Sequence, residues 1–196
     1  MKKGVAGSAN AQVIFATDRL LVRPYSLDDR KFVLDMYSRR QVQQFLGPSP
    51  KPLVSVDGAD AAIGRWRAFS DGNPLIGLWA VTLKNGEPVG TVLLKMAPLS
   101  TAKKPLPLSN DFEVGWHLHP DHWGHGYATE AAAGALRRGF DAGVGEVIAL
   151  IHPENARSKH VAERLQLQHL GLTDRYYSMQ AELYRITRDY WLRGSA

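Results

Sequence analysis

The chain has 196 residues, of which 44% are hydrophobic and 22% charged, a composition typical of one globular domain with a sizeable core. It has no cysteine, which excludes disulfides, thiolate metal sites and a cysteine nucleophile. The formal net charge of +5 favours an anionic partner, but lysine and arginine are scattered along the chain. The first interpretation is therefore a solvated surface, the second is a phosphate-bearing small ligand, and no nucleic acid is expected.

The N-terminal residues 1–12 are expected to form a disordered tail, and residues 13–196 a single domain. Lys2 and Lys3 precede a stretch that faintly suggests a signal peptide, but this stretch is too short and too polar to act as one. No apolar run approaches the ~18 residues of a transmembrane helix. We therefore expect a soluble, cytoplasmic protein without a membrane partner.

The first part of the chain predicts a strand followed by two helices. The strand is expected over residues 13–25, and Ser26 then caps the first helix, with acidic residues in its first turn. Residues 47–52 break the chain, and Ser55 or Asp57 caps the second helix. The expected inner faces are Phe32, Val33, Met36 and Tyr37 in the first helix and Ala61, Ala62, Trp66 and Phe69 in the second.

A β-hairpin comes next. Residues 76–83 and 88–94 are rich in β-formers and are joined by Asn85-Gly86, a strong hairpin signal. Residues 97–110 form a long Pro-containing connection, which in a compact domain is usually functional or disordered. The remaining expected elements are a strand at 112–118, a helix to about 142, a strand at 146–151, a helix at 155–165 and strands at 169–179 and 181–187. This order predicts a mixed α/β (α+β) domain.

The stretch 119–133 joins the expected strand at 112–118 to a helix through a turn that contains Gly124 and Gly126. A strand that leads through such a turn into a helix makes an anion site, because the first helical N–H groups have no partner inside the helix. Glycine lets the backbone come close to a ligand, since it has no Cβ. A diphosphate is the natural ligand of this turn.

The segment Pro120-Asp-His-Trp-Gly-His-Gly-Tyr-Ala-Thr-Glu-Ala131, taken with Asn155-Ala-Arg-Ser158, resembles the GNAT superfamily of acetyl-CoA-dependent N-acetyltransferases. The opening residues 17–24 resemble its ribosomal-protein N-terminal acetyltransferase branch, and the order of elements fits from Thr17 to Trp191. The resemblance implies a single GNAT-like domain with flanking helices and a mostly antiparallel central sheet, splayed at the cofactor site. It also implies acetyl-CoA as cosubstrate and an amine acceptor, either a protein N-terminus or a small molecule. A homodimer is left open.

The same resemblance implies which residues hold the cofactor. Backbone groups of the strand end would bind the pantetheine and thioester, backbone N–H groups of the turn would bind the pyrophosphate, and the start of the second helix would contact the cofactor arm. The expected cofactor-binding residues are Trp116, His117, Leu118, His122, Trp123, Gly124, His125, Gly126, Tyr127, Ala128, Thr129, Asn155 and Ser158.

The chain departs from the family pattern in three places. Asp121 stands where relatives often have Gln or Arg, three residues before the first glycine. Ala162 stands where many relatives have a Tyr that protonates the departing thiolate, and Leu165-Gln-Leu167 replaces the usual Leu-Gly-Phe. Ser158 or a water molecule is therefore the expected proton donor to the thiolate.

Acetylation needs a neutral amine, and a lysine-like amine titrates near ~10.4, so a base is expected in the site. Period-2 alternation places Asp111, Glu113, Gly115 and His117 on one face of their strand. Glu113 is the first candidate base and His117 the second, acting directly or through water. The alternative for Glu113 is a structural pairing with a nearby arginine or a loop cap. The Leu118 N–H is expected to stabilise the oxyanion.

Three other readings compete. All seven histidines lie between His117 and His169, which suggests metal binding, but cysteine and His-Glu-x-x-His are missing, so no metal is expected. A dinucleotide fingerprint would need a third glycine where Thr129 stands. A non-catalytic acetyl-CoA-binding member of the fold stays open because the Tyr is missing. The acceptor is not identified, and the segments expected to contact it are residues 39–70, 97–110 and 176–179.

Overall fold

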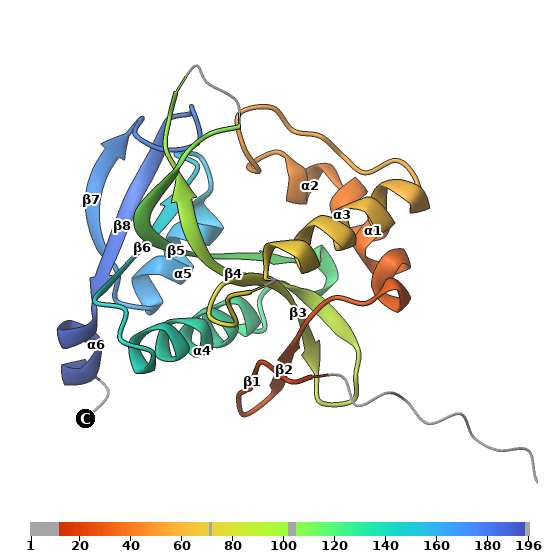
Figure 1. Cartoon of the computed structure of the whole chain (residues 1–196), viewed down its shortest axis with the longest axis horizontal. Helices are drawn as coiled ribbons and strands as arrows, with labels where there is room; N and C mark the ends of the chain where they lie inside the picture. Colours follow the sequence, from red (N-terminus) through yellow and green to blue (C-terminus); the bar gives the residue numbers. More distant parts are fainter. Residues whose placement is uncertain (1–11, 71, 102–104, 195–196) are drawn as a thin grey trace, which may run out of the picture.

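A computed structural model describes residues 12–70, 72–101 and 105–194 of the chain (Figure 1). The strands are β1 (Phe15–Ala16), β2 (Leu20–Arg23), β3 (Gly77–Leu83), β4 (Pro88–Pro98), β5 (Leu108–Leu118), β6 (Glu146–Ile151), β7 (Gln168–Thr173) and β8 (Ala181–Thr187). The α-helices are α1 (Arg30–Ser38), α2 (Arg40–Gln43), α3 (Val56–Phe69), α4 (Tyr127–Asp141), α5 (Ala156–Arg164) and α6 (Arg188–Gly194), and η1 (Leu27–Asp29) and η2 (Pro120–His122) are 3₁₀ helices.

The strands form one eight-stranded sheet in the order β1-β2-β3-β4-β5-β6-β8-β7. Neighbouring strands are antiparallel except for β5 and β6, which are parallel. Within the described strands, β5 pairs with β6 at Phe112 and Glu113 alone, although β5 continues to Leu118 and β6 to Ile151. The two strands therefore separate towards their C-terminal ends. This confirms the predicted mixed α/β domain with a splayed, mostly antiparallel sheet.

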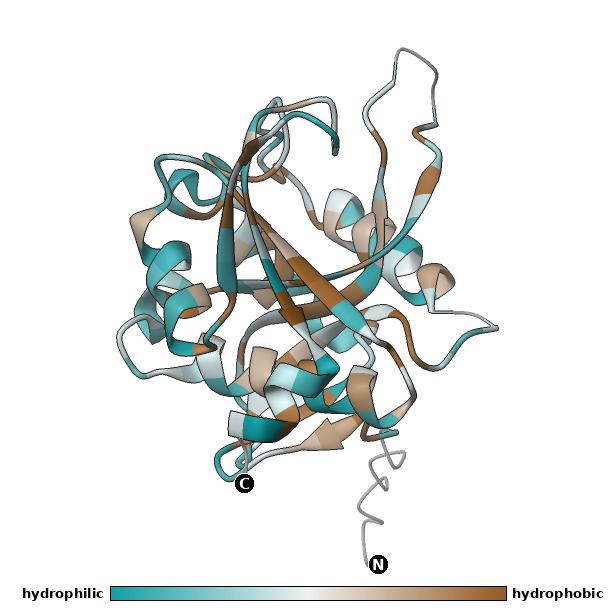
Figure 2. Ribbon diagram, turned by 90° about the vertical axis from the view of Figure 1, so that its left-hand side faces the viewer, coloured by the Kyte–Doolittle hydropathy of each residue, from teal (hydrophilic) through white to brown (hydrophobic). Residues whose placement is uncertain are grey.

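Helices cover both faces of the sheet. On one face, Leu136 and Phe140 of α4 and Val161 of α5 belong to the same core cluster as Val92 and Leu94 of β4. On the other face, α1 and α3 pack together over Ala80 of β3. Figure 2 shows hydrophobic residues concentrated on the central strands, with more hydrophilic ones on the outer helices and loops. None of the described helices has the length and apolarity needed to cross a membrane.

Local signals placed the early helices correctly. Ser26 accepts a hydrogen bond from the Asp28 N–H, and Asp29 completes a capping box, so the chain enters a helix at this point. Ser55, rather than Asp57, caps α3 and accepts a hydrogen bond from the Gly58 N–H at 3.1 Å. The Asn85-Gly86 hairpin joins β3 to β4 as expected.

Several boundaries differ from the expectation. Residues 13–25 form two short strands rather than one, because Thr17 and Arg19 turn the chain to bind Glu130. The helices α2 and α6 were not predicted, and the last strand pair is shorter, because β7 ends at Thr173. Of the four residues predicted on the inner face of α3, Ala62 is buried and Trp66 and Phe69 are partly buried, whereas Ala61 is exposed. Ala59 and Ile63, which were not predicted, complete the buried face.

Two expectations, the long connection at 97–110 and the N-terminal tail, fall on segments that the structure describes only in part. The long connection predicted over 97–110 is shorter, because β4 continues to Pro98 and β5 begins at Leu108; residues 102–104 lie outside the described part. Of the expected tail, Gln12 alone is described, so its disorder stays a prediction.

Candidate active site

The separation of β5 from β6 exposes one backbone edge of β5. The His119 N–H donates to the Val89 carbonyl of β4 at 3.0 Å, which fixes the alternation of backbone groups along this antiparallel pair. By that alternation, the backbone groups of His117 face β4, whereas those of Trp116 and Leu118 face the gap. The predicted backbone contacts are therefore available at Trp116 and Leu118, and His117 contributes its side chain instead.

A pocket of about 330 Å³ lies at this gap. It is lined by Gln41, Val42, Phe45 and Leu46 from α2 and the residues after it; by Trp116, His117 and Leu118; by His122, Trp123, Gly124, Gly126, Tyr127, Ala128 and Thr129; and by Asn155, Arg157, Ser158, His160, Val161 and Arg164. All the expected cofactor-binding residues line it except His125. The pocket thus joins the two segments that the sequence pattern linked.

The turn formed by residues 123–126, called here the glycine turn, needs its two glycines. Gly124 and Gly126 have φ values of +82° and +79°, a region that residues with a Cβ seldom adopt. Gly126 is the N-cap of α4 and provides no side chain to cap the helix. The N–H groups of Tyr127, Ala128 and Thr129 consequently have no partner within α4 and are free to bind an anion.

Thr129 adds a hydroxyl group to the same helix end. Its Oγ1 is buried and has no hydrogen-bond partner among the described residues. A buried hydroxyl without a partner is costly, so its position in the first turn of α4, on the pocket wall, is suited to a ligand oxygen.

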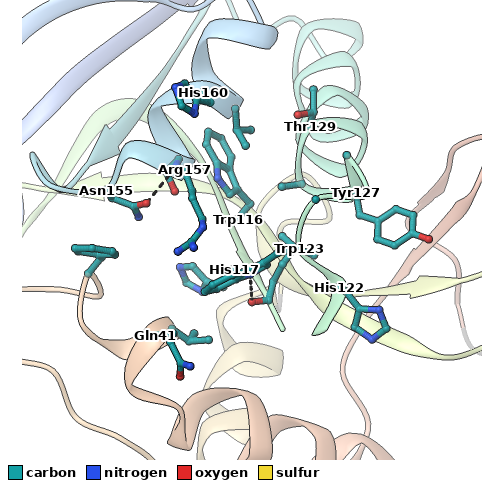
Figure 3. Close-up of a pocket in the computed structure, with 18 of the residues that line it drawn as sticks. Gln41, Trp116, His117, His122, Trp123, Tyr127, Thr129, Asn155, Arg157 and His160 are labelled. Carbon is teal, nitrogen blue, oxygen red and sulfur yellow. Dashed lines mark hydrogen bonds between the residues drawn. The ribbon is translucent and has the colours of Figure 1, made fainter. Parts of the chain in front are cut away.

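Arg19, which the sequence did not single out as a site residue, holds the glycine turn from the outside. Its Nε lies 2.6 Å from Glu130 Oε2, its Nη1 donates to the His125 carbonyl at 3.0 Å, and its guanidinium lies 4.9 Å from the centre of the Tyr127 ring. Burial alone would raise the pKa of Glu130, but hydrogen bonds from Thr17 and Arg19 lower it. Figure 3 shows the Tyr127 ring directed away from the pocket, so its backbone is the part that faces a ligand.

The start of α5 forms the opposite wall. Asn155 caps the helix, since its Oδ1 accepts a hydrogen bond from the Ser158 N–H at 3.1 Å. The Arg157 guanidinium lies 4.5 Å from the centre of the Trp123 ring, and the Trp123 indole donates to the Leu118 carbonyl at 2.9 Å (Figure 3). Arg157 and Arg164 make this wall basic.

His117 is held by neighbours on the other side of the sheet. Its Nδ1 lies 2.9 Å from the Tyr37 hydroxyl, and that hydroxyl lies 2.8 Å from Thr91 Oγ1. Burial, and then the positive charge of Lys95, lowers the pKa of His117 to about 4. The imidazole is therefore neutral at pH 7. Tyr37 was expected only as a packing residue of the first helix, and Thr91 was not singled out, because nothing in the local sequence links either residue to His117.

Glu113, the first candidate base, is engaged elsewhere. Its Oε2 lies 2.9 Å from Lys95 Nζ and accepts a short hydrogen bond from the Tyr177 hydroxyl. Burial, and then the charge of Glu113, raises the pKa of Tyr177. Glu113 does not line the pocket, whereas His117 and Ser158 do. The carboxylate thus matches the structural alternative, with a lysine in place of the expected arginine.

The clustered histidines have separate partners. His119 Nε2 lies 3.3 Å from Asp35, His122 Nε2 lies 3.6 Å from Glu87, and His125 stacks on Tyr127. Within residues 12–70, 72–101 and 105–194, no group of three or more histidine or acidic side chains is placed to hold a metal ion. The metal-binding reading has no support in this part of the chain.

Comparisons with known proteins agree with this arrangement. A family model described as an acetyltransferase (GNAT) domain matches residues 19–168, more than half of the chain. The FsC-acetyl coenzyme A-N(2)-transacetylase of Aspergillus fumigatus is 34% identical over 193 residues, which cover 93% of this chain and 80% of that protein.

Solved structures show the same fold at low identity. RimJ of Mycobacterium smegmatis, in complex with CoA-disulfide, aligns with a TM-score of 0.68 at 17% identity, over 90% of this chain and 89% of that one. RimL, a ribosomal L7/L12 alpha-N-protein acetyltransferase, aligns with a TM-score of 0.73 at 14% identity, over 94% and 98% of the two chains. With the matching family model and the relative at 34% identity, the conclusion is that the chain belongs to the GNAT acetyltransferase family and is an acetyltransferase that uses acetyl-CoA.

Proposed function

We propose that this protein is an N-acetyltransferase that moves the acetyl group of acetyl-CoA to the amine of a small molecule by direct attack. The observation that carries the proposal is the pocket at the gap between β5 and β6, which ends at the uncapped N-terminus of α4. A small-molecule acceptor is favoured over a protein N-terminus because the 34% identical relative is named an FsC-acetyl coenzyme A-N(2)-transacetylase and not a ribosomal-protein acetyltransferase. The ribosomal-protein acetyltransferases are similar in fold at 14–17% identity.

The residues present fit acetyl-CoA. The free N–H groups at the start of α4 and the unpartnered Thr129 hydroxyl suit the oxygens of a pyrophosphate. Arg157 and Arg164 suit phosphate charge, and the backbone of Trp116 and Leu118 suits the amide groups of a pantetheine arm. When bound, acetyl-CoA would supply the activated acetyl group, and the Leu118 N–H, which faces the gap, would donate a hydrogen bond to the oxyanion.

We assign the proton-accepting role to His117 rather than to Glu113. His117 lines the pocket and is neutral at pH 7, whereas Glu113 is paired with Lys95 and Tyr177. Ser158, also on the pocket wall, or water is the donor to the departing sulfur. Location in the cytoplasm and a homodimer stay predictions.

The cofactor is tested by calorimetric titration with acetyl-CoA, CoA and dephospho-CoA. We expect micromolar binding of acetyl-CoA, and weaker binding by Thr129→Val, which removes the unpartnered hydroxyl. Thr82→Val, which changes a buried threonine of β3 that does not line the pocket, is the control. No binding at millimolar concentration by the folded protein would overturn the proposal.

The acceptor is tested by a screen of small amines and of peptides with free N-termini, with detection of released thiol. Thiol release with small amines and not with peptides supports a small-molecule acceptor. Thiol release with peptides and not with small amines contradicts it. Tight binding of acetyl-CoA without thiol release from either group would favour a non-catalytic member of the fold.

A further inference from the structure

A network of three buried hydroxyl groups leads to His117 on the face of the sheet that α1 and α3 cover. The Tyr25 hydroxyl lies 3.1 Å from the Gly90 carbonyl oxygen and 2.6 Å from Thr91 Oγ1. The Tyr37 hydroxyl lies 2.8 Å from Thr91 Oγ1 and 2.9 Å from His117 Nδ1. Tyr25, Thr91 and Tyr37 are 2%, 0% and 5% exposed, so water has no access to compete for these bonds. These three residues are called here the hydroxyl network.

The number of protons in the network fixes its direction. Four hydrogen bonds need four protons, and each of the three hydroxyl groups donates one. The Gly90 carbonyl can only accept, so the Tyr25 proton points towards it. Thr91 then donates to Tyr25, and Tyr37 donates to Thr91. The fourth proton, in the bond between Tyr37 and His117, has to come from His117 Nδ1.

The charge states agree with this direction. Burial raises the pKa of Tyr25 and of Tyr37, so both hydroxyl groups keep their protons. His117 is neutral at pH 7, because burial lowers its pKa to about 4, and so it carries one ring proton. If that proton is on Nδ1, then Nε2 has a free electron pair.

We propose that the hydroxyl network holds His117 in the Nδ1–H tautomer, so that Nε2 accepts the proton of the attacking amine. Tyr25, Thr91 and Tyr37 are then positioning residues, and His117 is the catalytic residue. This inference rests on the proposed acetyl transfer to an amine. The tautomer itself is a property of the protein alone and is open to direct measurement.

The reaction balances with these groups. The amine nitrogen uses its electron pair to form a bond to the acetyl carbon, and the carbon–sulfur bond breaks with its electron pair left on sulfur. The extra proton on the nitrogen passes to His117 Nε2, and the thiolate takes a proton from water. His117 then returns its proton to solvent. A weakly basic imidazole is sufficient, because a nitrogen that has bonded to an acyl carbon holds its proton far less tightly than a free amine does.

The test reads the tautomer by ¹⁵N NMR of the histidine rings in the ligand-free protein. The wild type should show His117 protonated on Nδ1, with the signal assigned by its loss in His117→Gln. The decisive variant is Thr91→Val, which keeps the backbone pairing of residue 91 with His117 and lies outside the pocket lining. Without an oxygen at position 91, the Tyr37 proton turns towards His117 Nδ1 and drives the ring to the Nε2–H tautomer. Thr82→Val is the matched control, because it removes a buried threonine hydroxyl of the same sheet outside the network.

The expected result is a change of tautomer in Thr91→Val and none in Thr82→Val. In Thr91→Val, kcat should fall on the order of 100-fold, the size of a typical general-base contribution, and the affinity for acetyl-CoA should be unchanged. If Thr91→Val does not fold, Tyr37→Phe provides the measurement, because it frees Nδ1 and lets the Nε2–H form dominate.

An Nε2–H tautomer in the wild type, or an unchanged tautomer in the folded variants, would overturn the inference. Calorimetry with acetyl-CoA keeps the two proposals apart. If the protein does not bind acetyl-CoA, the proposed function is contradicted, whatever the tautomer of His117. If the protein binds acetyl-CoA and releases thiol but His117 is in the Nε2–H form, only the inference about the tautomer is contradicted.

Discussion

Lys95 and Glu113 form a buried ion pair at the point where β5 separates from β6, with Lys95 Nζ 2.9 Å from Glu113 Oε2. Their side chains are 12% and 9% exposed, so the pair is largely shielded from solvent. The Tyr177 hydroxyl is hydrogen-bonded to both partners. The carboxylate that the strand pattern favoured as a base is therefore part of the structure that fixes where the gap begins.

Glu113→Gln should destabilise the fold, because it leaves the Lys95 ammonium buried without a carboxylate. Breaking a buried pair typically costs about 3–5 kcal/mol, and replacing both partners costs much less. Urea unfolding should therefore show a large loss for Glu113→Gln and a partial recovery for Glu113→Gln combined with Lys95→Met. Unchanged stability together with a large fall in kcat would instead restore Glu113 as the base.

The parts of the site that the sequence predicted are those made by neighbouring residues. The glycine turn, the α4 N-terminus and the start of α5 after Asn155 each depend on residues within a few positions of one another, so local pattern is sufficient. The Ser26 cap of the first helical segment is a signal of the same kind.

The parts that the sequence did not predict depend on distant residues. Glu113 meets Lys95, 18 residues away, and Tyr177, 64 residues away, and no pattern along the chain connects them. The first strand is divided because Thr17 binds Glu130, 113 residues later. The inner face of α3 was predicted only in part: Ala62 and Trp66 were expected there, but Ala59 and Ile63 were missed. The contacts of Trp66 with Tyr25 and Tyr37 join residues far apart in the sequence.

Gly124→Ala should weaken acetyl-CoA binding by more than its effect on stability explains. A Cβ at Gly124 would meet no atom within 4 Å, so the cost to the fold is backbone strain at φ +82°, about 1–2 kcal/mol. Because Gly124 lines the pocket, the strained turn and the added methyl group also disturb the ligand site. Calorimetric titration with acetyl-CoA measures the affinity.

Gly143→Ala is the matched control for this change. Gly143 has φ +92°, also has no atom within 4 Å of a built Cβ, and lies beyond the far end of α4. Both variants should lose similar stability, and Gly124→Ala alone should lose affinity. Equal affinity in the two variants would show that the glycine turn does not contact the cofactor.

Arg19→Gln should lower acetyl-CoA affinity several-fold while changing the free energy of unfolding by less than about 1 kcal/mol. Arg19 is 50% exposed, so its ion pair with Glu130 contributes little to stability. Arg19 does bond to the His125 carbonyl and contact the Tyr127 ring, so it fixes the conformation of the glycine turn before a ligand binds. A turn that is already in its binding conformation binds more tightly. Arg185→Gln removes a comparably exposed pair with Glu146 and should leave affinity unchanged. Equal losses of affinity in both variants would argue for a general charge effect.

Because of His117, the free energy of unfolding should decrease as the pH falls from about 6.5 to about 4. Its pKa is about 4 in the folded protein, mainly because of burial, and its ordinary value is 6.5. Between these values the unfolded chain binds more protons than the folded one, so the free energy of unfolding decreases with decreasing pH. The difference corresponds to at most about 3 kcal/mol, and to less if solvent in the pocket stabilises the charged ring.

Comparing the wild type with His117→Gln isolates this contribution, because the glutamine variant keeps every other titrating group. The carboxylates with lowered pKa, Asp35, Glu130 and Glu182, also lose stability in acid, but they do so equally in both proteins. Urea unfolding between pH 4 and 7 should therefore give a steeper slope for the wild type, with the two curves parallel above pH 7. Parallel curves throughout would mean that the pKa of His117 is the same in the folded and unfolded chains, which would contradict the effect of burial on this residue.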